Sequence, residues 1–394
     1  MHCTFSGSGL VPRMALDPAL DGFLRLVEAR GDIDGRFTNL RRIGLGGGGG
    51  QFSLVFAAWD NVSNREVAVK VYRPDQLLDT YRVQCFNREA QLLERLGGAR
   101  GILGWVAPRG EFKERVQTTA GIGFELKFPF FVVELASCDV GALIRDGTWS
   151  AEQRLLAFRQ MCKSIQRVHR EGISHRDIKP SNFLVMGTGD VKLSDFGTAR
   201  DLNGNEPPVA ASYAAPPGDI RYSAPEMVAL LHDDDPSIAF RGDLYALGAT
   251  FFEMWTGTVL GLQLFGPLFA ADLAKAMNAV HKRDRRRVYL QFVQSIASGH
   301  PLPSISSYGS GVPTSILELI DGLYKSISAL DYRSRLCDFE RIFLRIDQCV
   351  LVLRNEEKVR SWRRNKELFR RKREEKRTRL CKRREMTGHA GGNR

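Results

Sequence analysis

The spacing of apolar residues along the chain predicts strands in its first part. Apolar and polar positions alternate there, or short apolar runs end at turn residues, as is typical of half-buried and buried strands. Asn61 and Asn64 mark one such turn. The expected strands are residues 37–45, 52–59, 65–72 and 128–135. Their order along the chain favours an antiparallel meander.

Helical spacing takes over after the first three expected strands. Over residues 81–96, Phe86, Ala90 and Leu93 recur on one face, and Glu89 lies inside this apolar stripe. A short helical pattern also falls within residues 15–36. Further helices are expected at residues 151–171, 242–256, 270–281, 288–298 and 316–329. A sheet followed by helices predicts an α+β protein with two lobes of different class.

Composition agrees with a globular protein of two lobes. The chain has 394 residues, of which 43% are hydrophobic and 26% are charged. Its net charge is +12, but residues 354–394 alone hold 17 Lys+Arg and six Glu, a local net of +11. The basic character is therefore a property of the C-terminal tail. One interpretation is a solvated helix or disordered extension; the alternative is an anionic partner, namely nucleic acid, an acidic protein, a membrane surface or a nuclear-import receptor.

The cysteines and the N-terminus predict a cytoplasmic protein, or a nuclear one in a eukaryotic host. None of the seven cysteines has CxxC or zinc-site spacing, which favours buried thiols in a reducing compartment. The apolar stretch 244–271 contains Glu253 and is expected to be a core helix rather than a membrane span. Residues 1–36 are expected to be an N-terminal extension that begins with a tag remnant, with Met14 as the natural start.

A glycine-rich segment is the first candidate for chemistry. Residues 48–55 fit GxGxxGxV with Ser53 in the third glycine place, while a second register uses Gly44, Gly46 and Gly49. Glycine permits positive φ and a close approach of the backbone to phosphates. The candidate nucleotide-binding residues of this segment are Gly46, Gly48, Gly50 and Val55. The alternative is a flexible hairpin turn.

Lys70 and Glu89 are expected to pair. Lys70 ends the apolar strand Val67–Val69 and precedes Glu89 by 19 residues. A carboxylate on an apolar helical stripe is costly unless a cation meets it, and such a pair can aim an ammonium group at phosphates. Alternatively, Glu89 reaches solvent.

Two polar loops supply further candidates. His175-Arg176-Asp177-Ile178-Lys179-Pro180-Ser181-Asn182 is followed by Asp195-Phe196-Gly197, with Asp195 eighteen residues after Asp177. The oxygen atoms of Asp177, Asn182 and Asp195 are of the kind that Mg²⁺ prefers.

Together these segments resemble eukaryotic-type protein kinases of the Ser/Thr-specific form. Ala224-Pro225-Glu226, the segment 243–248 and the segment 331–335 extend the resemblance, which covers about residues 37–350 with seven motifs in order. It implies a small antiparallel β lobe with one key helix (37–134), a larger, mainly helical lobe (135–350) and a basic tail (351–394). It also implies that Arg335 pairs with Glu226.

The resemblance implies transfer of the γ-phosphate of ATP, with Mg²⁺, to Ser or Thr hydroxyls of protein substrates. Lys70, held by Glu89, would contact the α- and β-phosphates. Asn182 and Asp195 would bind the metal ions, Asp177 would accept the hydroxyl proton, and Lys179 would neutralise charge on the γ-phosphate. Ala68, Val133, Glu134 and Ala136 would bind the adenine.

One position departs from the family pattern. Asp219 stands where these kinases usually have threonine, and it would either pair with Lys179 or repel Asp177. Arg176 implies a basic pocket for a phosphate on the activation segment, with Ser212 and Tyr213 as candidate acceptors. The alternatives to an active kinase are a pseudokinase scaffold and a nucleic-acid-binding protein that acts through its tail.

Overall fold

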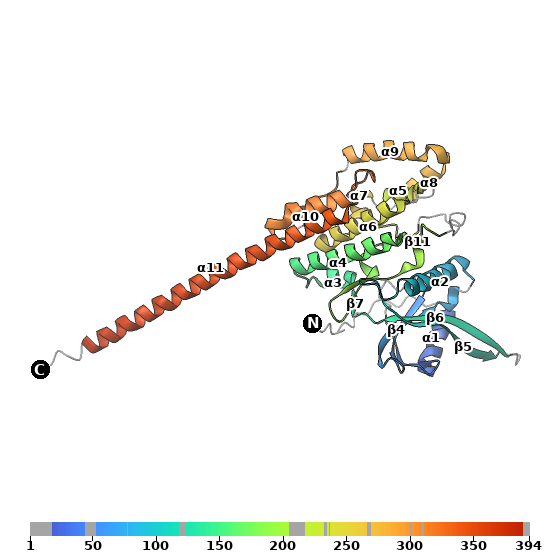
Figure 1. Cartoon of the computed structure of the whole chain (residues 1–394), viewed down its shortest axis with the longest axis horizontal. Coiled ribbons are helices and arrows are strands. Elements are labelled where there is room, and N and C mark those ends of the chain that lie inside the picture. The colour runs from blue at the N-terminus through green and yellow to red at the C-terminus, as the bar shows by residue number, and fades with distance from the viewer. Residues whose placement is uncertain are drawn as a thin grey trace.

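The computed structural model has a small lobe built on one sheet and a larger helical lobe, from which one long helix projects (Figure 1). This is the predicted α+β architecture with an antiparallel small lobe. The structure describes residues 18–43, 53–76, 78–117, 123–204, 217–231, 235, 237–265, 269–299, 301–308 and 311–388.

The small lobe holds a six-stranded antiparallel sheet in the order β1-β2-β3-β4-β6-β5. Its strands are β1 (Asp32–Ile33), β2 (Phe37–Arg42), β3 (Ser53–Asp60), β4 (Arg65–Tyr72), β5 (Trp105–Gln117) and β6 (Gly123–Glu134). The β3–β4 hairpin and β6 confirm the predicted strands to within a few residues. The sequence did not predict β5, whose alternating charges, such as Arg109, Glu111 and Lys113, hide an edge strand.

The two faces of this sheet carry different residues. Strands β3 and β4 pair Val55 with Lys70 and Ala57 with Ala68, and β6 adds Phe131 and Val133 opposite Lys70 and Ala68. Paired residues share a face, so these side chains lie together. The other face is covered by α1 (Pro18–Arg30), whose Phe23 packs against Phe128 at 4.6 Å between ring centroids.

Helix α2 (Thr80–Arg95) confirms the helix predicted at residues 81–96. It begins where the Asp79 carboxylate accepts a hydrogen bond from the Arg82 backbone N–H. Its apolar stripe is buried as expected, and Glu89 is buried with it. The same buried face packs against the short 3-10 helix η3 (Phe196–Thr198), so α2 connects the sheet to the large lobe.

The large lobe is mainly helical. Its helices are α3 (Val140–Asp146), α4 (Ala151–Arg170), α5 (Pro225–Val228), α6 (Ser237–Thr256), α7 (Leu260–Phe265), α8 (Phe269–Asn278), α9 (Lys282–Gly299), α10 (Thr314–Ile327) and α11 (Phe339–Gly388), with a short η6 (Ile305–Tyr308). Helix α6 is buried on nearly every side, including Leu247 and Phe251. All five predicted large-lobe helices are present, with ends shifted by up to six residues.

Short strand pairs shape the loops between the lobes. Strands β9 (Phe183–Val185) and β10 (Val191–Leu193) form a hairpin that also pairs with β7 (Cys138–Asp139), and β8 (Ile173–Ser174) pairs with β11 (Arg200–Asp201). The 3-10 helix η2 (Pro180–Asn182) leads directly into β9. The hairpin therefore brings the chain segments before β9 and after β10 side by side.

Helix α11 runs without a break through residue 350, where the sequence suggested a boundary between kinase domain and tail. Its first turns pack on the large lobe through Ile342, Ile346 and Cys349, and Arg354 pairs with Glu152 at 2.7 Å. Beyond this contact the helix extends away from both lobes (Figure 1). Among the described residues, no helix is both long enough and apolar enough to cross a bilayer.

Candidate active site

The ion pair predicted between Lys70 and Glu89 is present. Lys70 Nζ lies 2.6 Å from Glu89 Oε1, and the two side chains are only 13% and 3% exposed. Burial works against the charge on Lys70, but the neighbouring carboxylates of Glu89 and Asp195 hold its pKa above the ordinary value. Asp195 also influences the pKa of Glu89, so its loop lies close to this pair. The ammonium group of β4 and the Asp195 loop therefore meet on one side of α2.

The Asp177 carboxylate is held by three donors. Lys179 Nζ lies 2.9 Å from Oδ2, and Asn182 Nδ2 lies 3.0 Å from the same oxygen. The backbone N–H of Asp219 donates to Oδ1 at 2.8 Å. Both oxygens are thereby oriented, and Asp177 is nearly buried. Lys179 and Asn182, which the sequence placed in the same loop as Asp177, thus both bind the Asp177 carboxylate.

Lys179 is expected to stay charged at this site. Burial opposes its charge, but Asp177, Asp195 and Asp219 hold its pKa above the usual range. The ammonium group contacts the Asp177 carboxylate and is also stabilised electrostatically by Asp195 and Asp219. It is suited to neutralise negative charge that a ligand would bring between them.

The β9–β10 hairpin brings Asn182 and Asp195 together. The Ser194 backbone N–H donates to the Asn182 carbonyl at 2.9 Å, and the Ser194 hydroxyl donates to the same oxygen. Asp195 follows Ser194 in a left-handed conformation, with φ of 61°. This unusual backbone angle for a non-glycine residue is of the kind that marks functional sites.

The oxygen atoms present here fit a magnesium ion. Asn182 uses its Nδ2 group for Asp177, so its amide oxygen is not engaged in those bonds. Within the described part of the chain there is no cluster of three His, Cys, Asp or Glu side chains with metal-site geometry. Mg²⁺ does not need one, because it is usually bound through one or two protein oxygens, phosphates and water.

The predicted adenine-binding positions line the same side of the small lobe as Lys70. Ala68 and Val133 are paired neighbours on β4 and β6 and are almost fully buried. Glu134 accepts hydrogen bonds from Lys192 at 2.5 Å and from the Gly104 backbone at 3.2 Å. Its side chain is thus engaged with the protein, while the chain continues through Ala136 to the large lobe. Gly46, Gly48 and Gly50 lie outside the described residues.

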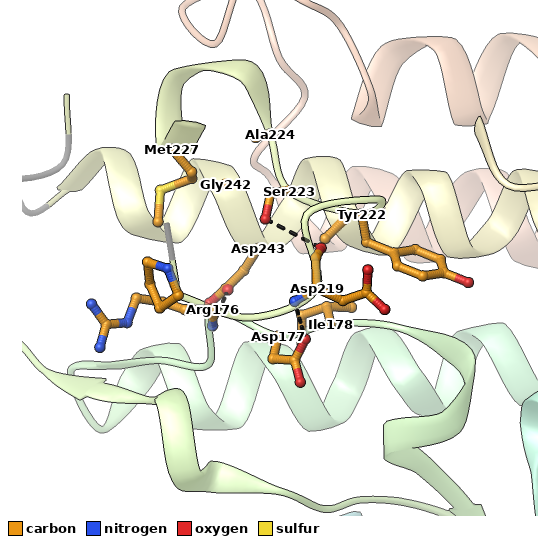
Figure 2. A pocket seen from close by; sticks show the side chains of 12 residues that line it. Arg176, Asp177, Ile178, Asp219, Tyr222, Ser223, Ala224, Met227, Gly242 and Asp243 are labelled. Carbon is orange, nitrogen blue, oxygen red and sulfur yellow. Dashed lines mark hydrogen bonds between the residues drawn. The ribbon is translucent and has the colours of Figure 1, made fainter. Parts of the chain in front are cut away.

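The Asp219 side chain takes neither of the two partners expected from the sequence. Its carboxylate forms a two-point contact with Arg221, at 3.0 Å from Nε and 2.7 Å from Nη2. Figure 2 shows the carboxylate turned away from Asp177, toward which only the backbone N–H points. Burial opposes the charge of Asp219, but Arg221 and Lys179 hold its pKa below the ordinary value. The negative charge of the aspartate that stands in place of threonine is therefore compensated by the neighbouring Arg221.

This segment encloses a pocket beside Asp177 (Figure 2). Gly218 makes the close approach possible, because a Cβ atom there would lie 2.3 Å from the Arg176 carbonyl oxygen and its φ is +85°. The pocket is lined by Arg176, Asp177, Ile178, Pro217, Asp219, Tyr222, Ser223, Ala224, Met227, Gly242, Asp243 and Ala246.

The pair predicted between Arg335 and Glu226 is confirmed. Arg335 donates to both carboxylate oxygens, and neither side chain is exposed to solvent. The contact joins the start of α5 to the loop before α11. It fixes the segment that follows the pocket to the core of the large lobe.

Arg176 makes a contact with the backbone of the activation segment. Its Nε donates to the Thr198 carbonyl at 2.7 Å. The candidate phosphate acceptors Ser212 and Tyr213 lie outside the described residues. The phosphate pocket remains a prediction.

Two positioning contacts were missed by the sequence reasoning. Buried Asp243 accepts the backbone N–H groups of His175 and Arg176, both at 2.8 Å, and so holds the loop that carries Asp177. Arg88 donates to the Gly197 carbonyl at 3.0 Å and ties α2 to the Asp195 loop. Its partner is 109 residues away along the chain. For Arg88, the only sign in the sequence was a positive charge next to Glu89.

Comparison with known proteins agrees with this geometry. Residues 41–264 match the family described as protein kinase domain. A probable serine/threonine-protein kinase of Corynebacterium efficiens is 34% identical over 217 residues, which are 55% of this chain and 30% of that protein. The serine/threonine-protein kinase PknB of Mycobacterium tuberculosis is 32% identical over 244 residues, 60% of this chain and 34% of the relative. The chain thus spans about a third of the length of the relatives that it matches.

Proposed function

The chain belongs to the protein kinase family, and from this premise we propose that it transfers the γ-phosphate of ATP to Ser or Thr hydroxyls of protein substrates. The observation that carries the proposal is that Asp195 acts on the buried Lys70–Glu89 pair, while its neighbour Ser194 hydrogen-bonds to Asn182 of the loop that contains Asp177. Phosphoryl transfer requires positioned reactants and neutralised charge rather than covalent help from the protein. The site offers both.

Lys70 and Lys179 would receive the phosphates of the nucleotide. Lys70 is fixed by Glu89 and is suited to bind the α- and β-phosphates, while Lys179 beside Asp177 is suited to neutralise charge on the transferred group. Asn182 and Asp195 would hold Mg²⁺, which supplies further neutralisation of phosphate charge when bound. Val55, Ala68, Val133 and the chain from Glu134 to Ala136 would enclose the adenine.

Asp177 would accept the proton of the acceptor hydroxyl. The hydroxyl oxygen forms the new bond to the γ-phosphorus, the bond from that phosphorus to the β–γ bridging oxygen breaks, and ADP leaves. The three donors to Asp177 hold its carboxylate in one orientation. Ser and Thr acceptors are favoured because Lys179 follows Asp177 by two residues and because the printed names of the relatives are those of serine/threonine kinases.

The test is transfer of radiolabelled γ-phosphate from ATP to a mixture of basic and acidic proteins that contain Ser and Thr, with Asp177→Asn as the control. We expect transfer by the unchanged chain and a loss of at least about a hundredfold in the variant. Mass spectrometry of the products would identify the acceptor residues. Equal and negligible transfer by both proteins, together with retained nucleotide binding, would instead indicate a pseudokinase scaffold.

A further inference from the structure

Helix α11 carries an exposed row of apolar side chains on the face opposite the large lobe. Leu344 and Leu351 are 69% and 60% exposed, although Ile342, Ile346 and Cys349 of the same turns are buried against the lobe. Phe369 continues the row and is 68% exposed. By helical spacing, the positions of Trp362 and Leu380 fall on the same line. We define the row by five helix positions, those of Leu344, Leu351, Trp362, Phe369 and Leu380, of which Leu344, Leu351 and Phe369 have exposed side chains.

The row is straight. Successive members are separated by 7, 11, 7 and 11 residues, and each pair of steps spans 18 residues, which are five full turns of about 3.6 residues each. A strict seven-residue repeat would drift around the helix and favour a supercoiled partner helix. This spacing instead keeps the row on one side along the whole helix, as a flat partner requires.

The acidic residues of the tail lie on one side of the helix, opposite this row, whereas its bases lie on all sides. At 100° per residue, all six glutamates of the tail fall within about 50° of the line opposite the row. They are Glu356, Glu357, Glu367, Glu374, Glu375 and Glu385. The positions three or four residues from Trp362, Phe369 and Leu380 include no acid and many bases. These bases are Lys358, Lys366, Lys372, Arg373, Lys376, Arg377, Arg383 and Arg384.

We propose that this face of α11 docks the protein on an anionic lipid bilayer surface, with the helix lying in the plane of the interface. Apolar side chains there enter the boundary between headgroups and acyl chains, while flanking lysines and arginines bind anionic headgroups. The row faces away from the large lobe, so a flat surface can follow the helix from Leu344 onward. Nucleic-acid phosphates would use the bases but would gain nothing from exposed leucines. A second copy of the helix would bring like charges together.

The first test compares two neighbouring apolar residues in the full chain. Phe369 lies in the row, whereas Leu368, 53% exposed, lies about 100° away from it. Sedimentation with vesicles of phosphatidylcholine and phosphatidylserine should show that Phe369→Ser weakens binding about tenfold or more, because a buried phenyl group is lost. Leu368→Ser should weaken it by less than about threefold. Both residues are exposed, so neither change should affect folding.

A second pair of variants tests the charges with the same substitution. Arg373 is on the row side, whereas Arg371 pairs with Glu367 on the opposite side at 3.2 Å. Arg373→Glu should weaken vesicle binding about tenfold, and Arg371→Glu should have a clearly smaller effect. Binding to phosphatidylcholine alone should be weak, and binding to the mixed vesicles should fall as salt is raised.

Several outcomes would overturn the proposal. These are absence of binding to the mixed vesicles, equal losses within each pair of variants, and self-association that Phe369→Ser abolishes. Binding to duplex DNA that is indifferent to Phe369→Ser, without vesicle binding, would assign the face to nucleic acid instead. Phosphate transfer to a soluble peptide should be the same for all four variants. The docking proposal can therefore fail while the kinase proposal stands, and the reverse.

Discussion

Replacement of Glu226 by glutamine tests how strongly the buried pair with Arg335 stabilises the large lobe. Both side chains are completely buried, and the guanidinium group donates to both carboxylate oxygens. The Tyr289 hydroxyl donates to the same carboxylate at 3.2 Å. Glu226→Gln keeps the shape of the side chain but removes its negative charge. It therefore leaves a buried guanidinium group without a counter-ion.

The expected loss can be bounded from these contacts. Removal of one partner from a buried ion pair costs about 3–5 kcal/mol, because the remaining charge stays desolvated. Arg335 keeps its hydrogen bonds to the carbonyl oxygens of Ala329 and Arg241, which favours the lower end of this range. We expect the free energy of unfolding to fall by about 3 kcal/mol, a large part of the roughly 5–15 kcal/mol that is typical of a domain.

Urea unfolding followed by far-ultraviolet circular dichroism measures this loss. The matched control is Glu66→Gln, because Glu66 pairs with Arg41 at 2.5 Å but is 55% exposed. An exposed pair contributes less than about 1 kcal/mol, so the control should unfold almost like the unchanged chain. If the two variants lost similar free energies, or if Glu226→Gln lost less than about 1 kcal/mol, burial of the pair would not be the cause of its strength.

Three further predictions concern the site and the small lobe. Glu89→Gln should lower kcat of peptide phosphorylation about a hundredfold, because Lys70 loses the partner that positions it. The melting temperature of this variant should stay above the assay temperature, so that the chain remains folded. Gly218→Ala should abolish most phosphate transfer, measured by steady-state kinetics, because the new methyl group would meet the Arg176 carbonyl. The affinity for nucleotide, measured by fluorescence titration, should change by less than about threefold. Asp60→Asn should destabilise the protein at pH 7. Arg36 holds the pKa of Asp60 below its usual range, so this carboxylate stabilises the fold fully above pH about 4 and less as the pH falls further. The difference in free energy of unfolding between the two proteins, measured with urea, should therefore shrink in acid. A difference independent of pH would contradict this reasoning.

The elements that the sequence predicted well are those whose pattern is local. Strand β4 has the predicted bounds, and α2 differs from its prediction by one residue at each end. Both have a clear apolar period, which depends on which side of the element faces the core. Strand β5 has no such period over much of its length, because it lies at the sheet edge and exposes charged residues. Its pairing with β6 could only be recognised in three dimensions.

The candidate site shows the same division. The motifs identified the residue types that the chemistry needs. The pair of Lys70 with Glu89 could be inferred because a buried charge requires an opposite charge, and the pair of Arg335 with Glu226 followed from the resemblance to protein kinases. The partner of Asp219 could not be inferred: the sequence suggested a pair with Lys179 or repulsion by Asp177, and the structure shows Arg221 instead. Backbone geometry decided among them: it turned the N–H toward Asp177 and the carboxylate toward Arg221.

The sequence by itself determined the α+β class, the kinase motifs and the concentration of positive charge in the tail. These features follow from residue types, order and short spacings, which do not depend on how distant segments meet. Only the tertiary structure decided that Asp243 and Arg88 support the loops of the site, since their partners are backbone groups that carry no signature in the sequence. It also decided which face of α11 remains uncovered, because that depends on where the large lobe ends and the helix continues alone.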